Sequence, residues 1–156
     1  MAAEDHMRRA IALSLEMMRS SRGGPFGAVV VQGDMIVAEG FNQVTSANDP
    51  TAHAEVVAIR RACQALGTFD LTGCEIYTSC EPCPMCLSAI YWARLSRIYY
   101  ANDRVDAAKI GFRDDYLYKE VNRPLAERSI PIRPLLRDEG WAAFEEWMHK
   151  PDKVEY

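Results

Sequence analysis

Residues 78–89 constrain this chain more than any other stretch, because three cysteines crowd around a proline that can begin a helix. The cysteines are Cys80, Cys83 and Cys86, so two C-x-x-C pairs overlap. Proline is favoured at the first helical position, so Pro84 predicts a helix with Cys83 at its cap and Cys86 one turn in. Side chains three apart on a helix are neighbours, and two sulfurs on one tetrahedral zinc lie about 3.8 Å apart. We therefore expect Cys83 and Cys86 to be metal ligands and Cys80 to be a buried neighbour on the incoming strand.

A third ligand is expected from the segment T-A-H-A-E, which ends at Glu55. The residues from Asp49 to Thr51 predict a helix start, with Thr51 as the N-cap of a helix that runs to about Leu66. His53 and Glu55 then lie two apart in the first turn and face different ways. Both can serve one site only if the end of the helix points at the metal. Three protein ligands leave a fourth position for water, which is typical of a catalytic zinc.

His53-Ala54-Glu55 followed by Pro82-Cys83-Pro84-Met85-Cys86 matches the H-x-E and P-C-x-x-C signature of zinc nucleobase deaminases. The similarity is wider than this signature. Segments beginning at Gly23, Asn48, Tyr77 and Gly111, and the closing K-V-E-Y, resemble bacterial guanine deaminases of the cytidine deaminase-like zinc family. The resemblance covers nearly the whole chain.

This resemblance implies an α/β fold, a three-layer α/β/α sandwich around a mixed five-stranded sheet. It also implies a single domain over residues 1–156, one Zn²⁺ per subunit, and a homodimer that exchanges residues from about 136 to 156. The implied reaction is hydrolytic deamination of guanine to xanthine and ammonia by a zinc-activated water. Glu55 would be the proton shuttle.

By the same resemblance, Asp114 is a second catalytic carboxylate that also contacts the base, and Tyr156 closes the partner subunit's pocket. Asn42 matches an asparagine that hydrogen-bonds the base in the proteins this chain resembles, and Phe26 and Ala54 are the remaining expected substrate contacts. Guanine carries donors at its 2-amino group and N1, and a carboxylate only accepts hydrogen bonds, so an aspartate would suit it.

Taken without the resemblance, several of these residues have plainer interpretations. Phe26 suits the core as well as it suits stacking on a flat ring. Asn42 is typical of a turn, and Asp114 of a solvated acidic loop. Arg113 departs from the family, where another acid is expected, and it can pair with either Asp114 or Asp115. Which aspartate faces the pocket is therefore open at this point.

The 156 residues suit one domain, with 49% hydrophobic and 26% charged residues as in soluble globular proteins. A net charge of −4 argues against general affinity for nucleic acid, and no long apolar run predicts a membrane span or signal peptide. Five cysteines, three of them clustered, suit a reducing cytoplasm.

Elsewhere, hydrophobic periodicity predicts helices over residues 3–20 and 140–149, and strands over 26–31, 35–41, 75–78 and 97–101. Residues 105–109 and 116–121 suit short helices around a loop at 111–115. The segment 130–135 suits an edge strand despite Pro131 and Pro134. Trp92 is expected either in the core or in a pocket wall, with the core favoured.

Three other functions remain open. Cytosine deaminase and tRNA adenosine deaminase would share Asn42, His53, Glu55, Cys83 and Cys86. A binding module could instead close a structural zinc site with Cys80 as the fourth ligand. A redox role for Cys80 and Cys83 leaves the His-x-Glu segment unexplained.

Overall fold

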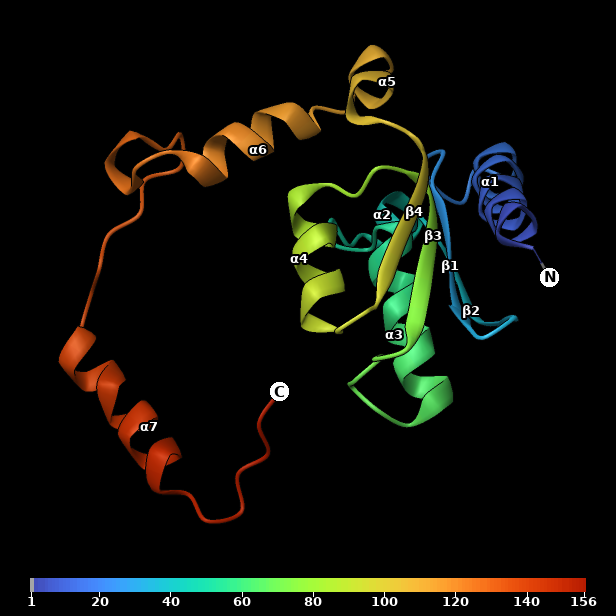
Figure 1. The fold of residues 1–156 in the computed structure, drawn as a ribbon. Coiled ribbons are helices and arrows are strands. Elements are labelled where there is room, and N and C mark those ends of the chain that lie inside the picture. Colours follow the sequence, from blue (N-terminus) through green and yellow to red (C-terminus); the bar gives the residue numbers. More distant parts are fainter. Residues whose placement is uncertain (1) are drawn as a thin grey trace.

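The fold is built on one mixed sheet of four strands, in a computed structural model that describes residues 2–156. The strand order is β2-β1-β3-β4 (Figure 1). β1 (Gly27–Gln32) runs antiparallel to both β2 (Met35–Phe41) and β3 (Cys74–Cys80), whereas β4 (Arg97–Asn102) is parallel to β3. One helix joins the parallel strands β3 and β4, in a strand–helix–strand crossover.

Helices cover both faces of this sheet (Figure 1). α1 (Ala3–Arg19) packs on one face, and α3 (Ala54–Leu66) and α4 (Pro84–Trp92) lie on the other. The remaining elements are α2 (Val44–Ala47), α5 (Arg104–Lys109), α6 (Asp114–Asn122), the 3₁₀ turn η1 (Leu125–Glu127) and α7 (Arg137–His149).

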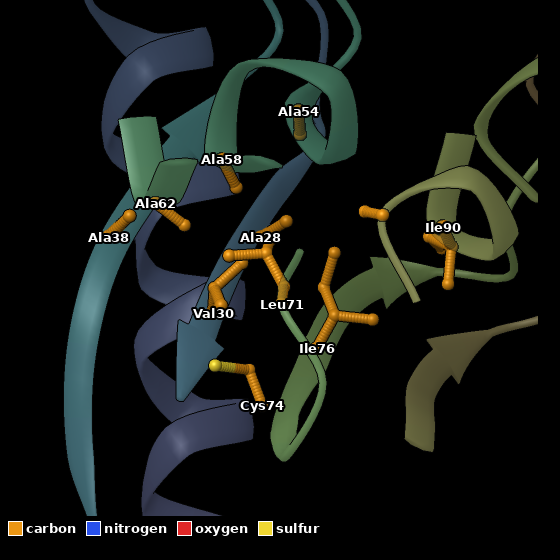
Figure 2. Packing of buried hydrophobic residues seen from close by; sticks show 11 residues of the cluster. Ala28, Val30, Ala38, Ala54, Ala58, Ala62, Leu71, Cys74, Ile76 and Ile90 are labelled. Atoms are coloured by element: carbon orange, nitrogen blue, oxygen red, sulfur yellow. The ribbon is translucent and has the colours of Figure 1, made fainter. Parts of the chain in front are cut away.

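The alternation of side chains along β1 divides the core in two, because successive residues of a strand face opposite sides. Val29 and Val31 pack with Leu13 of α1. Ala28 and Val30 pack on the other face, against the alanines of α3 (Figure 2). Every residue of β1 from Gly27 to Val31 is buried, as expected for a central strand covered by helices on both sides.

Small residues bring α3 unusually close to the edge strand β2. A Cβ atom on Gly40 would lie 2.3 Å from the Ala54 carbonyl oxygen and 2.5 Å from the Ala58 backbone nitrogen. No side chain fits there unless the helix moves. Gly40 therefore sets the depth at which the first turn of α3 rests beside the end of β2, where the site is built.

The predicted fifth strand is wrong. Within the described residues, the segment 130–135 is irregular and pairs with no strand. Pro131 and Pro134 have no backbone N–H to donate to a ladder, and residues 131–135 are exposed to solvent. Trp92 was also predicted wrongly, since 68% of it is exposed on the outer side of α4.

The C-terminal part of the chain leaves the sheet. α6 extends from the top of the fold and α7 lies well apart from the strands, before the tail turns back (Figure 1). Every residue of α7 is exposed, including Trp141, Phe144 and Trp147. Three large aromatics on one short helix are thus left without a covering surface in the single chain. Among the residues described, no helix combines the length and apolar character needed to cross a membrane.

Candidate metal and active site

The first residues of two helices meet at the site. His53 is the N-cap of α3, with φ −68° and ψ 155°, and Cys83 is the N-cap of α4, with φ −67° and ψ 169°. Pro84 begins α4 as predicted, which places Cys86 in its first turn. Because helix N-termini carry partial positive charge, both helices favour thiolates and bound anions here.

The predicted cap of α3 was off by two residues. Thr51 does not cap the helix, which begins only at Ala54. The backbone N–H and hydroxyl of Thr51 instead both donate to Asp49 Oδ1, at 2.8 and 2.6 Å. His53 takes the cap position in an extended conformation. Its ring can therefore turn toward the cysteines while Glu55 sits on the helix itself.

His53, Cys83 and Cys86 have the spacing of a zinc site. The Nδ1 atom of His53 lies 3.6 Å from Cys83 Sγ and 3.4 Å from Cys86 Sγ. Zinc bonds of about 2.0–2.1 Å to nitrogen and about 2.3 Å to sulfur place these atoms about 3.6 Å apart in a tetrahedron. All the ligand atoms lie within 4.8 Å of one another. The three residues therefore fit one zinc ion and leave a fourth position.

Charge at the cluster also suits a cation. Hydrogen bonding from Cys86, and then from His53, holds the pKa of Cys83 down to about 4. A low thiol pKa favours the thiolate, the form that binds metal. Cys80 stands on β3 as predicted and is buried, and burial raises its pKa to about 12. The group of metal-binding side chains contains His53, Cys83 and Cys86 but not Cys80, which argues against a closed four-ligand site.

Glu55 is buried beside the cluster, with only 7% of its surface exposed. Burial raises the pKa of Glu55 to about 7, because removal from water penalises the charged carboxylate. A cation held by His53 and the cysteines would lower this pKa again. A carboxyl group that titrates near neutrality can both accept and donate protons.

A cavity of about 260 Å³ opens onto this cluster. Its walls come from the turn before β1, the loop after β2 with α2, the first turn of α3, the cysteine turn (residues 80–83) and the start of α6. The lining residues are Gly24, Phe26, Asn42, Val44, Thr45, Pro50, His53, Glu55, Cys80, Glu81, Cys83, Phe112 and Asp114.

Asn42 is oriented by the backbone. Its Oδ1 atom accepts hydrogen bonds from the N–H groups of Gly24, at 3.4 Å, and Val44, at 3.1 Å. The oxygen is thereby occupied, and the Nδ2 group is the donor that Asn42 can offer to a ligand. Asn42 is thus buried in a turn and lines the cavity as well, so the two interpretations of this residue are compatible.

The two neighbouring aspartates occupy different environments. Asp114 lines the cavity, and burial raises its pKa, assisted by the negative charge of Cys83. Asp115 instead accepts from Arg113, whose Nε atom is 3.3 Å away, and this hydrogen bond lowers its pKa. Arg113 therefore pairs with the aspartate that faces away from the cavity, and Asp114 is the one that faces it.

Two predicted substrate contacts do not line the cavity. Ala54 is fully buried, and its side chain belongs to the core under α3, so only its backbone remains available. Tyr156 does not line the cavity of its own chain. The centroid of its ring lies 6.1 Å from that of Trp92 and 6.5 Å from that of Phe69. Phe26 does line the cavity.

Phe112 and Glu81 are lining residues that the sequence reasoning did not single out. The Phe112 ring meets Phe26 edge to face, at 4.8 Å between centroids and 86° between planes. Its position beside Asp114 in the G-F-R-D-D segment was the available signal. Glu81 lies between Cys80 and Pro82, and its carboxylate is bound by Arg104.

Comparison with known proteins agrees with this geometry. Residues 1–102 match the cytidine and deoxycytidylate deaminase zinc-binding region. The chain is 50% identical over 153 residues to guanine deaminase of Bacillus subtilis, covering 98% of each. The X-ray structure of that organism's guanine deaminase superposes with a TM-score of 0.97, covering 100% of this chain and 99% of the other.

More distant relatives share less of the chain. Guanine deaminase from Nitrosomonas europaea superposes with a TM-score of 0.70 at 31% identity, covering 93% of this chain and 84% of that one. A tRNA-specific adenosine deaminase from Agrobacterium fabrum is 47% identical over 76 residues, 49% of this chain and 50% of its own.

The protein therefore has the fold of the zinc-dependent deaminases, with a His-Cys-Cys centre. It belongs to the cytidine and deoxycytidylate deaminase zinc-binding family. Within that family, its near-full-length similarity is to guanine deaminase.

Proposed function

We propose that this protein hydrolyses guanine to xanthine and ammonia. The observation that carries the proposal is the cavity, where Glu55 and Asp114 stand beside the His53, Cys83 and Cys86 cluster and Asn42 offers a donor. The similarity to Bacillus subtilis guanine deaminase, 50% over 98% of the chain, supports guanine as the substrate.

His53, Cys83 and Cys86 would hold the zinc. When bound at such a site, zinc lowers the pKa of water toward about 7 and so supplies a nucleophile at neutral pH. Glu55 accepts a proton from the attacking water and returns it to a ring nitrogen. It then helps to protonate the departing amine, so water adds, ammonia leaves and no net proton is consumed.

Recognition of the base follows from the polar groups of the cavity. Asp114 accepts hydrogen bonds, which suits the 2-amino group on the reacting carbon of guanine and the N1–H beside that carbon. Asn42 presents Nδ2 as a donor, which suits the ring acceptors. Asp114 can also share in moving the proton, because burial raises its pKa. Ala54 would contribute only its backbone.

The flat apolar part of the base would lie against Phe26. Phe112 supports Phe26 from the side in an edge-to-face contact, an arrangement that aromatic pairs prefer. A cavity of about 260 Å³ lies near the lower limit for ligand pockets, about 300 Å³. This size favours a free base over a nucleoside.

The working form would be a homodimer of single-domain subunits that exchange residues from about 136 to 156. The exposed Trp141, Phe144 and Trp147 support this arrangement, because an apolar helix face of this kind needs a partner surface. Tyr156, 74% exposed in the single chain, would then close the partner subunit's cavity over the base. Five cysteines, three of them clustered, support a cytoplasmic enzyme. The net charge of −4 supports action on a small molecule and not on nucleic acid.

The test is ammonia release from a panel of guanine, cytosine, adenine, guanosine and adenosine-containing tRNA. The purified zinc-containing protein should act on guanine and form xanthine. Activity on cytosine or tRNA with none on guanine would refute the proposal. The tRNA alternative has less support, because the match to the Agrobacterium enzyme covers only 49% of this chain.

A further inference from the structure

We infer that Arg104 is a positioning residue. It holds α6, the helix that bears Asp114, against the cysteine turn, and so fixes the distance between Asp114 and the metal ligands. This inference rests on the proposed function, because it concerns the reach of Asp114 to the base. Few other contacts hold α6. No residue of α6 is fully buried, and the helix projects from the fold (Figure 1).

Arg104 is bound to the cysteine turn through three hydrogen bonds to the Glu81 carboxylate. Its Nε and Nη2 atoms donate to Glu81 Oε2 at 3.0 and 2.8 Å, and its backbone N–H donates to Oε1 at 3.0 Å. Glu81 is itself fixed, since its backbone N–H donates to the Asn102 carbonyl at 2.7 Å. Charge-assisted contacts of this kind constrain orientation as well as distance.

The same guanidinium also holds α6. Its central carbon lies 3.8 Å from the centroid of the Tyr118 ring, within the range of a cation–π contact. The Tyr118 hydroxyl donates to the Pro82 carbonyl at 2.8 Å, one residue before the ligand Cys83. Tyr118 is therefore bound twice, once to Arg104 and once to the turn itself.

Tyr118 and Asp114 stand four residues apart on α6, so they share one face of the helix. On that face, Asp114 lines the cavity and Tyr118 contacts Pro82 and Arg104. The lock thus acts one helical turn from Asp114. A displacement of about 1 Å in a catalytic geometry can reduce a rate about 100-fold. Freeing α6 should therefore displace Asp114 and lower the rate of guanine turnover.

Three variants separate positioning from charge. Tyr118→Phe keeps the ring and the ion pair but removes the hydroxyl bond to Pro82. Arg104→Lys keeps the positive charge beside Glu81 but loses the planar fork, and Arg104→Met removes both. Arg123→Met is the matched control, because Arg123 pairs with Glu120 at 2.9 Å at the far end of the same helix and does not reach the turn.

The purified zinc-containing proteins are compared by guanine turnover and by hydrogen exchange. We expect kcat to fall about 3–10-fold in Tyr118→Phe and about 10–100-fold in Arg104→Met, with Arg104→Lys between them and zinc content unchanged. Amide exchange over residues 114–122 should quicken in these variants, while α3 and α4 stay protected. Arg123→Met should remain within about twofold of the unmodified protein.

The decisive comparison adds Arg104→Met to a protein that already carries Asp114→Ala. If Arg104 acts through Asp114, the second change should cost less than about twofold there. An equal loss in both backgrounds, or Arg104→Met matching Arg123→Met, would overturn the inference. A protein inactive on guanine before any substitution would sink the proposed function instead, and the exchange of α6 would still test the lock.

Discussion

Replacing Asp114 and Asp115 in turn tests the assignment of the second carboxylate, and each variant is the control for the other. The two residues are adjacent and carry the same charge, yet only Asp114 lines the cavity. Asp115 is held by Arg113, at 3.3 Å, with 67% and 37% of the Arg113 and Asp115 side chains exposed. The perturbation is a change to alanine at each position, compared on guanine.

The expected magnitudes differ widely. A hydrogen bond to a charged group is worth about 1.5–3 kcal/mol. At about 1.36 kcal/mol per tenfold, loss of recognition alone lowers kcat/KM about 10–160-fold. Loss of a group that also moves a proton costs about 10²–10⁴-fold. Asp114→Ala should therefore reduce kcat/KM by at least about tenfold, and by more if Asp114 shares the proton transfer. An exposed ion pair contributes about 0–1 kcal/mol, so Asp115→Ala should change it by less than about fivefold.

The assay is the initial rate of ammonia release across guanine concentrations, with zinc content measured for each preparation. Asp114→Asn adds a finer distinction, because an amide keeps one acceptor but cannot take up a proton. It should retain more binding than Asp114→Ala while kcat stays low. Equal, modest effects of Asp114→Ala and Asp115→Ala would show that the aspartate facing the cavity takes no part in the reaction.

Three further changes test other parts of the site. Glu55→Gln should lower kcat about 10²–10⁴-fold while metal analysis still finds zinc, because the amide cannot shuttle protons; unaltered turnover would show that Glu55 is not the proton shuttle. Deleting residues 154–156 should impair guanine turnover without loss of zinc if Tyr156 closes the cavity, and wild-type rates in the shortened protein would remove that role. Gly40→Ala should lower the free energy of unfolding by about 1–3 kcal/mol, since its Cβ would meet the Ala54 carbonyl at 2.3 Å; thermal melts that match the unmodified protein would contradict the close packing of α3 on β2.

Much of the sheet and the metal cluster could be predicted from local pattern. The strands β1, β2, β3 and β4 all begin and end within two residues of their predicted limits. Pro84 predicted the start of α4, and with it the places of Cys83 and Cys86. These features depend on backbone chemistry and short spacing, so they do not require knowledge of distant contacts.

The errors came where a residue's partner lies far away in the chain or is absent from it. The prediction of a fifth strand was wrong because segment 130–135 has apolar residues but no neighbouring sheet edge to pair with among the described residues. The prediction that Trp92 lies in the core was wrong because the single chain leaves this residue of α4 uncovered. The cap of α3 was missed for a local reason, since Thr51 lies in a turn with Asp49 and the helix begins only after His53.

The sequence by itself determined the ligand types, their order and the helix start that pairs two thiolates, because these depend on residue identity over a few positions. Only the tertiary structure decided which aspartate meets the cavity, how Asn42 is oriented, and that Arg104 ties Asp114 to the cysteine turn. Those facts depend on distances between residues that are far apart in the chain, such as Asn42 and Asp114, and packing alone sets such distances.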